Sequence, residues 1–412
     1  MTSSSLFPLL ADSAQTHGTP LWSYDAATIL ERIGRLRAFD TVRYAQKACS
    51  NLHILRLMRE HGLHVDAVSL GEIERALLAG FQVGGAPAGI VFTCDLFDRK
   101  TLERVVELGV EVNAGSIDML RQLGERSPGH RVWLRINPGF GHGHSRKTNT
   151  GGENSKHGIW HEDLHEALAV IRSYGLKLVG VHMHIGSGVD YSHLEEVARS
   201  MVQLIAGLGQ DIEAFSIGGG LSTPYRPGEA AVDVERYART WAVARKEIET
   251  LLGHPVHMEI EPGRFLMAES GRLVSEVRAV KRMGNRNYVL VDAGFNDLMR
   301  PAMYGAYHHM TLLDAEGRPV DRPLVDTVVG GPLCESGDIF TQDDQELRPQ
   351  PLPEAKVGDL LVFHDTGAYG ASMSSNYNSR PLLPEVLFSD GQARLIRRRQ
   401  TLDALLEQEL GL

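Results

Sequence analysis

The fold is decided by a strand-then-helix unit that first occurs at residues 42–62, VRYAQKACSNLHILRLMREHG. The apolar, β-branched run Val42–Ala45 predicts a buried strand. Apolar residues then recur at the spacing of one helix face over Leu52–His61, and Gly62 suits the position just after a helix end. This stretch therefore predicts one β-strand followed by one α-helix.

The same alternation continues as far as Glu261. Further helix candidates cover Gly71–Ala79, Glu162–Tyr174 and Asp233–Leu252. The strand candidates are Val42–Ala45, His64–Val68, Gly89–Cys94, Val110–Ala114, Arg131–Ile136, Leu178–Met183, Ile212–Ile217 and Val256–Glu261. Eight strands that alternate with helices match a (β/α)₈ barrel. A doubly wound open sheet is the alternative, and the barrel is favoured because the first strand carries no GxGxxG turn.

The pattern changes after residue 270, where helical stretches largely disappear and Pro and Gly clusters separate short apolar runs. The strand candidates here are Val274–Val280, Tyr288–Val291, Thr327–Val329, Leu360–Phe363 and Glu385–Phe388. We therefore expect two domains. One is an α/β barrel over residues 27–270, and the other is an all-β domain formed by residues 271–412 together with the N-terminal segment 1–26.

The composition argues against several classes of partner. The 412 residues include 42 Lys plus Arg and 52 Asp plus Glu, a formal net charge of −10, which disfavours nucleic acid and anionic membranes. Three scattered cysteines, Cys49, Cys94 and Cys334, form no CxxC pair and fit a reducing compartment. Residues 1–12 have no basic region and too short an apolar run to predict a signal peptide, and no apolar run approaches the roughly 18 residues of a membrane span. We expect a cytoplasmic protein.

A lysine follows the first strand, at the end of the barrel where active sites of this fold lie. Lys47 has apolar neighbours in the sequence. Burial among apolar groups lowers the pKa of a lysine and frees its amine as a nucleophile, as Schiff-base chemistry requires. A surface lysine that caps the next helix is an alternative of equal weight.

Polar residues after the second and sixth strands have structural as well as functional interpretations. Ser69 and Glu72, shortly after Asp66, have the spacing of a helix capping box, which is the favoured interpretation. His182 and His184 share one strand face. One imidazole is enough to stack on a planar cofactor, whereas a zinc pair lacks a third ligand at convincing spacing. For His182 we favour a core histidine with satisfied hydrogen bonds.

Glycines and a carboxylate follow the seventh and eighth strands. Gly218, Gly219 and Gly220 lie where these barrels often bind phosphate, because glycines let backbone N–H groups approach an anion, although any tight turn could use them. Glu261 is placed to keep a ring nitrogen protonated, or alternatively to pair with Arg264. A lysine, a ring-stacking histidine, a phosphate cradle and a carboxylate are the parts of a pyridoxal phosphate site.

The motifs around these residues resemble those of the pyridoxal-phosphate-dependent decarboxylases with the alanine-racemase fold, also called fold type III. The motifs are Tyr44-Ala-Gln-Lys47-Ala, His182-Met-His-Ile-Gly-Ser187, Gly218-Gly-Gly-Leu221 and Glu261-Pro-Gly-Arg264. Within this family, the motifs Asp292–Tyr304, Cys334–Asp338 and Gly367–Tyr369 are similar to those of the meso-diaminopimelate decarboxylases. The resemblance covers nearly the whole chain and is closest to the enterobacterial type, including the loop Gly139–His157.

The resemblance implies a carboxy-lyase that converts meso-2,6-diaminopimelate, at its D-centre, to L-lysine and CO₂ through a Schiff base of pyridoxal 5′-phosphate. This is the last step of lysine biosynthesis by the diaminopimelate route. A related decarboxylase acting on ornithine or arginine is the alternative, and such enzymes usually carry Asp where this chain has Glu335. A non-catalytic cofactor-binding protein and a metal-dependent barrel hydrolase are weaker alternatives, and we expect no metal.

The resemblance also implies a role for each site residue. The catalytic group would comprise the Schiff-base lysine, the partner of the pyridinium nitrogen, the ring stacker and the proton donor, which are Lys47, Glu261, His184 and Cys334. The remaining cofactor contacts would come from Asp66, Ser187, Gly218, Gly219, Gly220, Pro262, Gly263, Arg264 and Tyr369. The substrate would be bound by Arg264, Arg300, Tyr304, Glu335 and Tyr369. The arginines would bind carboxylates, Glu335 would bind the distal ammonium group, and a homodimer would share its active sites. Gly188 departs from the family, in which many relatives have Gln.

Overall fold

A computed structural model describes residues 6–141, 151–184, 186, 191–343 and 346–410 of the chain. It divides into two compact units. The barrel unit comprises Arg32–Ser222 and Ala231–Phe265, and the sheet unit comprises Met1–Glu31, Thr223–Ala230 and Leu266–Leu412.

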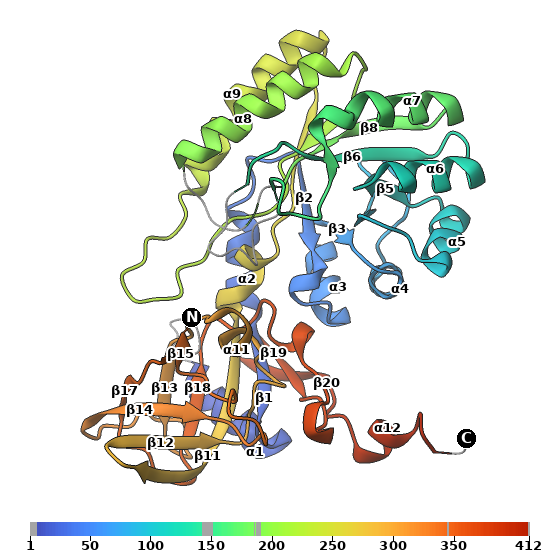
Figure 1. The fold of residues 1–412 in the computed structure, drawn as a ribbon. Coiled ribbons are helices and arrows are strands. Elements are labelled where there is room, and N and C mark those ends of the chain that lie inside the picture. The colour runs from blue at the N-terminus through green and yellow to red at the C-terminus, as the bar shows by residue number, and fades with distance from the viewer. Residues whose placement is uncertain (1–5, 142–150, 185, 187–190, 344–345, 411–412) are drawn as a thin grey trace. The chain divides into compact units, whose positions relative to one another are not determined.

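The barrel unit is a closed sheet of parallel strands (Figure 1). Its eight strands are β2 (Thr41–Ala45), β3 (His64–Ala67), β4 (Ile90–Cys94), β5 (Glu111–Ala114), β6 (Arg131–Asn137), β8 (Lys177–His182), β9 (Ala214–Ser216) and β10 (His257–Ile260). The order is β5-β4-β3-β2-β10-β9-β8-β6, and a pairing between β5 and β6 closes the ring. The predicted (β/α)₈ barrel is therefore confirmed and the open doubly wound sheet was wrong.

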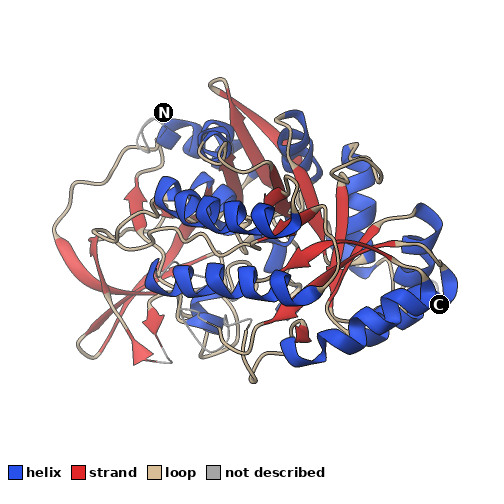
Figure 2. Cartoon of the chain, turned by 90° about the horizontal axis from the view of Figure 1, so that it is seen from above, coloured by secondary structure: helices blue, strands red, loops and turns tan. Residues whose placement is uncertain are grey.

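Helices, drawn in blue in Figure 2, alternate with these strands and pack on the outer face of the ring. They are α3 (Leu52–Glu60), α4 (Leu70–Ala79), α5 (Arg99–Leu108), α6 (Ile117–Arg126), α7 (Leu164–Tyr174), α8 (Tyr191–Leu208) and α9 (Val234–Leu252). Side chains of Asn51, Ser69, Asp98, Ser116 and Asp233 accept backbone N–H groups at the helix starts, which satisfies donors that a helix leaves open. The two-residue strand β7 (Ile159–Trp160) pairs with β6.

The sheet unit is built on nine strands, most of them antiparallel. They are β1 (Leu21–Asp25), β11 (Gly271–Met283), β12 (Arg286–Val291), β13 (Met310–Leu313), β14 (Leu324–Gly330), β17 (Gln350–Pro353), β18 (Leu360–Phe363), β19 (Glu385–Ser389) and β20 (Gln392–Arg397). A separate hairpin joins β15 (Gln342–Asp343) and β16 (Glu346–Leu347). Helices α1 (Phe7–His17), α11 (Arg300–Tyr304) and α12 (Leu402–Leu406) accompany the strands, so this unit contains helix as well as sheet.

The N-terminal segment is part of the core of the sheet unit. β1 lies between β11, with which it pairs antiparallel, and β19, with which it pairs parallel. Leu10 of α1 and Leu21 of β1 are completely buried together with Val274, Val362 and Val386. Two short helices, α2 (Ala26–Gly34) and α10 (Arg264–Met267), run across the division between the units.

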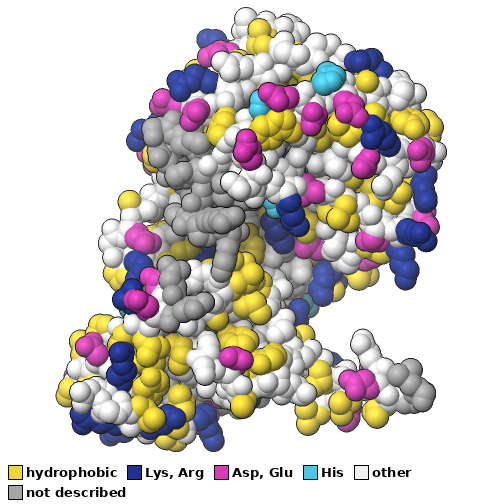
Figure 3. Space-filling model, in the orientation of Figure 1, with side chains coloured by type: hydrophobic (Ala, Val, Ile, Leu, Met, Phe, Trp, Pro, Cys, Tyr) yellow, Lys and Arg dark blue, Asp and Glu magenta, His cyan; other side chains and the backbone are white. Residues whose placement is uncertain are grey.

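The surface carries both signs of charge. On the face shown in Figure 3, Lys and Arg side chains are interspersed with Asp and Glu. Such mixing accords with the modest net charge of −10. Among the helices of the described ranges, none combines the length and the apolar character that crossing a membrane requires.

Candidate active site

Lys47 lies directly after β2 at the carboxyl end of the barrel, in a short 3₁₀ turn, Gln46–Ala48. The pairing of β2 with β3 places Ala45 opposite Asp66, and this brings Lys47 Nζ to 3.6 Å from Asp66 Oδ2. About half of the lysine side chain is exposed, whereas the Asp66 side chain is buried. The following helix is capped by Asn51. Lys47 is therefore an accessible amine beside a buried carboxyl group, and not a helix cap.

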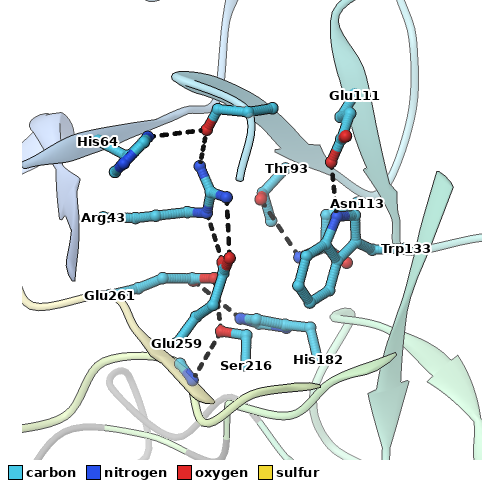
Figure 4. A network of polar contacts seen from close by, with 12 residues as sticks. Arg43, His64, Thr93, Glu111, Asn113, Trp133, His182, Ser216, Glu259 and Glu261 are labelled. Carbon is cyan, nitrogen blue, oxygen red and sulfur yellow. Dashed lines mark hydrogen bonds and ion pairs between the residues drawn. The ribbon is translucent and has the colours of Figure 1, made fainter. Parts of the chain in front are cut away.

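Three neighbouring strands converge on the carboxylate of Glu261 (Figure 4). His182 ends β8, and its Nε2 lies 2.9 Å from Glu261 Oε2. Ser216 ends β9, and its hydroxyl donates to Glu261 Oε1 over 2.7 Å. Both carboxylate oxygens are thus held. His182 is a buried core histidine as predicted, although its Nδ1 has no hydrogen-bond partner among the described residues.

The two buried carboxyl groups of the site have pKa values shifted in opposite directions. Burial alone would raise the pKa of Glu261, but the charge and hydrogen bond of His182, the Ser216 hydroxyl and the Lys47 charge together hold it well below its usual range. Burial raises the pKa of Asp66, the Lys47 charge opposes this, and the Glu261 charge adds to it. Two carboxyl groups whose pKa values are shifted in opposite directions can serve different catalytic roles. Glu261 stays ionised and is suited to hold a proton on a neighbouring ring nitrogen.

The glycine turn after β9 folds tightly against the ends of β8 and β10. A Cβ atom at Gly218 would lie 2.6 Å from His184 Cβ, and one at Gly219 would lie 2.6 Å from Glu261 O. Gly218 and Gly220 adopt φ values of 65° and 106°, which side-chain-bearing residues rarely adopt. Only glycine fits this turn, and its bare backbone is the kind of surface on which N–H groups approach a phosphate. Burial lowers the pKa of His184, so its ring is neutral. These residues fit pyridoxal phosphate.

The turn that follows Glu261 lies against the first strand of the barrel. Ala45 N donates to Pro262 O over 3.2 Å, and a Cβ atom on Gly263 would approach Ala45 O to 3.1 Å. Arg264 begins α10 immediately afterwards. This packing places the Glu261–Arg264 turn against Ala45, which precedes Lys47 by two residues. Ser187 and Gly188 lie outside the described residues.

The described ends of the Gly139–His157 loop are fixed at the same end of the barrel. Asn137 Oδ1 accepts from Gly139 N at 3.1 Å and from Gly152 N at 2.9 Å. His157 Nδ1 lies 2.6 Å from Oδ2 of Asp95, which follows β4. Asn137 and Asp95 are not among the site residues predicted from the sequence. Residues 142–150 of the loop are outside the described ranges.

The other predicted site residues belong to the sheet unit. Arg300 is buried at the start of α11, and Tyr304 ends that helix. Cys334 is exposed, and its backbone N donates to Asn378 Oδ1 over 2.9 Å. The hydroxyl of Tyr377 donates to Glu335 Oε2 over 3.4 Å. Cys334 and Glu335, which are consecutive in the sequence, thus lie on one loop that is held by hydrogen bonds to residues 377–378.

Tyr369 has a φ of 58°, an uncommon backbone conformation for a residue other than glycine. No set of three or more His, Cys, Asp or Glu side chains within the described ranges is grouped so as to hold a metal ion. The imidazole of His182 is instead committed to Glu261.

The capping box predicted at Ser69 is present, with one difference. Ser69 Oγ accepts from Glu72 N over 3.2 Å, but Glu72 Oε2 accepts from Val68 N, at 2.8 Å, one residue before the predicted partner. Burial raises the pKa of Glu72 to about 7, the hydrogen bond from Val68 opposes the rise, and the charge of Asp66 adds to it. The carboxyl group therefore costs stability once it loses its proton.

We expect Glu72→Gln to stabilise the protein progressively as the pH rises. Between pH 4.5 and 7 the unfolded chain ionises this group before the folded chain does, so the wild type loses stability relative to the variant. The gain should grow by about 1–3 kcal/mol across this range and then level off. Urea unfolding of both proteins at several pH values measures it. A difference that stays constant with pH would contradict the assignment.

Comparison with known proteins supports the geometry of the barrel. Residues 28–268 match the model of the family described as "Pyridoxal-dependent decarboxylase, pyridoxal binding domain". The chain is 65% identical over 404 residues to a diaminopimelate decarboxylase of Streptomyces coelicolor, covering 98% of this chain and 92% of the relative. It is 66% identical over 395 residues to that of Escherichia coli K12, with 95% and 94% covered.

Solved structures agree with these relatives. A crystal structure of diaminopimelate decarboxylase is 65% identical and superposes with a TM-score of 0.95, covering 98% of this chain and 96% of the other. The Helicobacter pylori diaminopimelate decarboxylase complexed with L-lysine is 32% identical, with a TM-score of 0.87 and 98% and 100% covered. Both likenesses extend over nearly the whole of each chain.

Proposed function

This chain belongs to the pyridoxal-dependent decarboxylases and, among them, to the diaminopimelate decarboxylases, and we propose how its own residues divide the work. It decarboxylates meso-2,6-diaminopimelate at the D-centre to give L-lysine and CO₂, with pyridoxal 5′-phosphate as cofactor. The alternative of an ornithine or arginine decarboxylase is not favoured, because full-length relatives at 54–66% identity are diaminopimelate decarboxylases.

The barrel unit supplies most of the residues that would hold the cofactor. When bound, pyridoxal phosphate withdraws electrons from the carbon that loses CO₂. Lys47 would bind it covalently through Nζ, and the turn Gly218–Gly220 would hold the phosphate together with Ser187 and Arg264, while Tyr369 would come from the partner copy, as proposed below. His184 would cover the ring, and Asp66 would lie beside the lysine amine.

The observation that carries this proposal is the fixed carboxylate of Glu261. His182 and Ser216 each occupy one of its oxygens, and its pKa is held low enough to keep it ionised. An ionised and immobile carboxylate stabilises a proton on the ring nitrogen without having to reorganise. We therefore assign Glu261 to the ring nitrogen, with His182 and Ser216 as its supports.

Glu261→Gln tests this assignment. The variant should keep the cofactor but lower kcat at least about a hundredfold, because a neutral amide does not hold the proton on the ring nitrogen. Steady-state CO₂ release and cofactor content measure the two properties. Glu235→Gln, at an exposed position on α9, is the control and should behave like the wild type. An unchanged kcat in the Glu261 variant would make this residue structural.

The sheet unit would supply the substrate contacts, a proposal that the resemblance supports. Arg264 from the barrel unit, with Arg300 and Tyr304, would bind the substrate carboxylates, and Glu335 would bind the distal ammonium group. Cys334 would donate the proton to the carbon that has lost CO₂. The exposed thiol and the supported loop of Cys334 are compatible with this role.

We further propose a cytoplasmic homodimer in which Cys334, Glu335 and Tyr369 act in the active site of the partner copy. The three cysteines form no disulfide with one another, which suits a reducing compartment.

Active sites shared between two copies predict that two inactive variants complement each other. Mixing the inactive variants Lys47→Ala and Cys334→Ala should restore about a quarter of wild-type activity, because half of the random dimers hold one intact site. Sedimentation of each protein gives the mass, and no recovery from exchanging dimers would contradict shared sites.

A further inference from the structure

Three side chains of the sheet unit, those of Arg300, His308 and Tyr225, form one cluster. Arg300 is 6% exposed and His308 is 3% exposed. Arg300 Nη1 lies 3.1 Å from His308 Nε2, and the guanidinium carbon lies 4.7 Å from the centre of the Tyr225 ring. The imidazole meets the same ring edge-on, with centroids 5.6 Å apart. The guanidinium group is thus contacted along its edge by an imidazole and across its face by a phenol ring.

The neighbouring strands determine which nitrogen of His308 carries the proton. The ladder between β13 and β18 is extended by a hydrogen bond of 2.9 Å from His364 N to His309 O. This brings His364 O to 2.8 Å from His308 Nδ1. A carbonyl oxygen only accepts, so Nδ1 carries the proton. Nε2 then accepts from Arg300, which only donates. His308 is therefore a neutral imidazole in a single tautomer.

This arrangement fixes the plane of the guanidinium group. A hydrogen bond on the edge stops rotation about the end of the side chain, and the Tyr225 ring fixes the tilt of the group by a cation–π contact. Recognition of a carboxylate by arginine depends on this plane, because two N–H groups must meet two oxygens together. A guanidinium that is already oriented also loses less conformational entropy when the ligand binds.

We propose that His308 is a positioning residue that orients Arg300 toward the carboxylate on the L-centre of the substrate, with Tyr225 as the second support. By orienting Arg300, His308 and Tyr225 make the enzyme selective for diamines that carry this carboxylate. The inference rests on the proposed function, in which Arg300 binds a substrate carboxylate. His308 itself contacts the arginine and not the reacting atoms.

The test compares ligands with and without that carboxylate on the holoenzyme. In His308→Leu, the KM for meso-diaminopimelate should rise about tenfold or more, since a hydrogen bond to a charged group is lost. The Ki of L-lysine, which keeps the L-centre carboxylate, should rise in parallel. The Ki of pentane-1,5-diamine, which lacks it, should stay within about twofold and kcat within about threefold. His308→Gln places an amide oxygen near the position of Nε2. Its KM for meso-diaminopimelate should therefore be close to the wild-type value.

The adjacent His309 provides a matched control, because it is exposed and belongs to the same loop. His309→Leu should leave all four constants unchanged. An unchanged KM in His308→Leu, or an equal loss for pentane-1,5-diamine, would overturn the inference. If His308→Leu does not fold with cofactor, Tyr225→Leu is judged by the same criteria.

Arg300→Ala separates the inference from the function on which it rests. If this variant keeps the wild-type KM for meso-diaminopimelate, the proposed role of Arg300 is wrong and the inference falls with it. If Arg300→Ala raises the KM and neither His308→Leu nor Tyr225→Leu does, only the positioning role is wrong.

Discussion

Replacing Lys47 with alanine is expected to abolish CO₂ release from meso-diaminopimelate, with a loss of at least about 10⁴-fold in kcat. The lysine is the accessible amine at the end of β2, 3.6 Å from a buried carboxyl group, and its removal takes away the covalent attachment of the cofactor. The visible absorption band of lysine-bound pyridoxal phosphate should disappear from the purified protein. Activity assays and absorbance spectra of the same preparations measure both effects.

The control for this experiment is Lys246→Ala. Lys246 is exposed on α9 and is not one of the predicted site residues. This variant should keep both the absorption band and turnover. If Lys47→Ala released CO₂ at an appreciable rate, the nucleophile would have to be another residue.

Replacing Glu259 with leucine is expected to destabilise the protein by about 3–5 kcal/mol. Glu259 and Arg43 form an ion pair inside the barrel (Figure 4), with both side chains at most 2% exposed. Arg43 Nε lies 2.5 Å from Glu259 Oε2, and Arg43 Nη2 lies 3.0 Å from Oε1. Without the carboxylate, a guanidinium group stays buried with its main partner removed, and such a charge is costly.

The double variant Arg43→Met, Glu259→Leu is the informative comparison. Removing both charges should recover most of the lost stability, because well-packed apolar residues of similar volume often replace a buried pair at little cost. Glu213→Leu, which breaks the half-exposed pair with Arg131, should cost less than about 1 kcal/mol. Urea unfolding measures all three. A single variant no less stable than the double variant would show that the pair does not act as a unit.

The barrel was predictable because its strands are buried and each one is recognisable from its own short stretch of sequence. β4 and β5 are buried along almost their whole length, so each appears in the sequence as a short apolar run. All eight predicted runs overlap observed strands. β1 was not predicted, although all five of its residues are buried. Its partners β11 and β19 lie hundreds of residues away, and no local pattern reports such pairing.

The candidate site was predictable to the same extent. Lys47, the Gly218–Gly220 turn and Glu261 follow barrel strands directly, so the rule that barrel sites lie at the strand ends finds them. The hydrogen bond from Ser216 to Glu261 was not predicted. The sequence did carry a signal for it, because both residues lie at the ends of neighbouring strands. The contact between His308 and Arg300 had no local signal, because it depends on the ladder between β13 and β18.

CO₂ release from a panel of substrates shows whether this chain is a decarboxylase selective for meso-diaminopimelate. The purified protein with pyridoxal phosphate is given meso-diaminopimelate, ornithine, arginine or lysine at equal concentration. We expect rapid CO₂ release from meso-diaminopimelate, with L-lysine as the product, and rates at least about a hundredfold lower from the other three. Faster release from ornithine or arginine than from meso-diaminopimelate would contradict it.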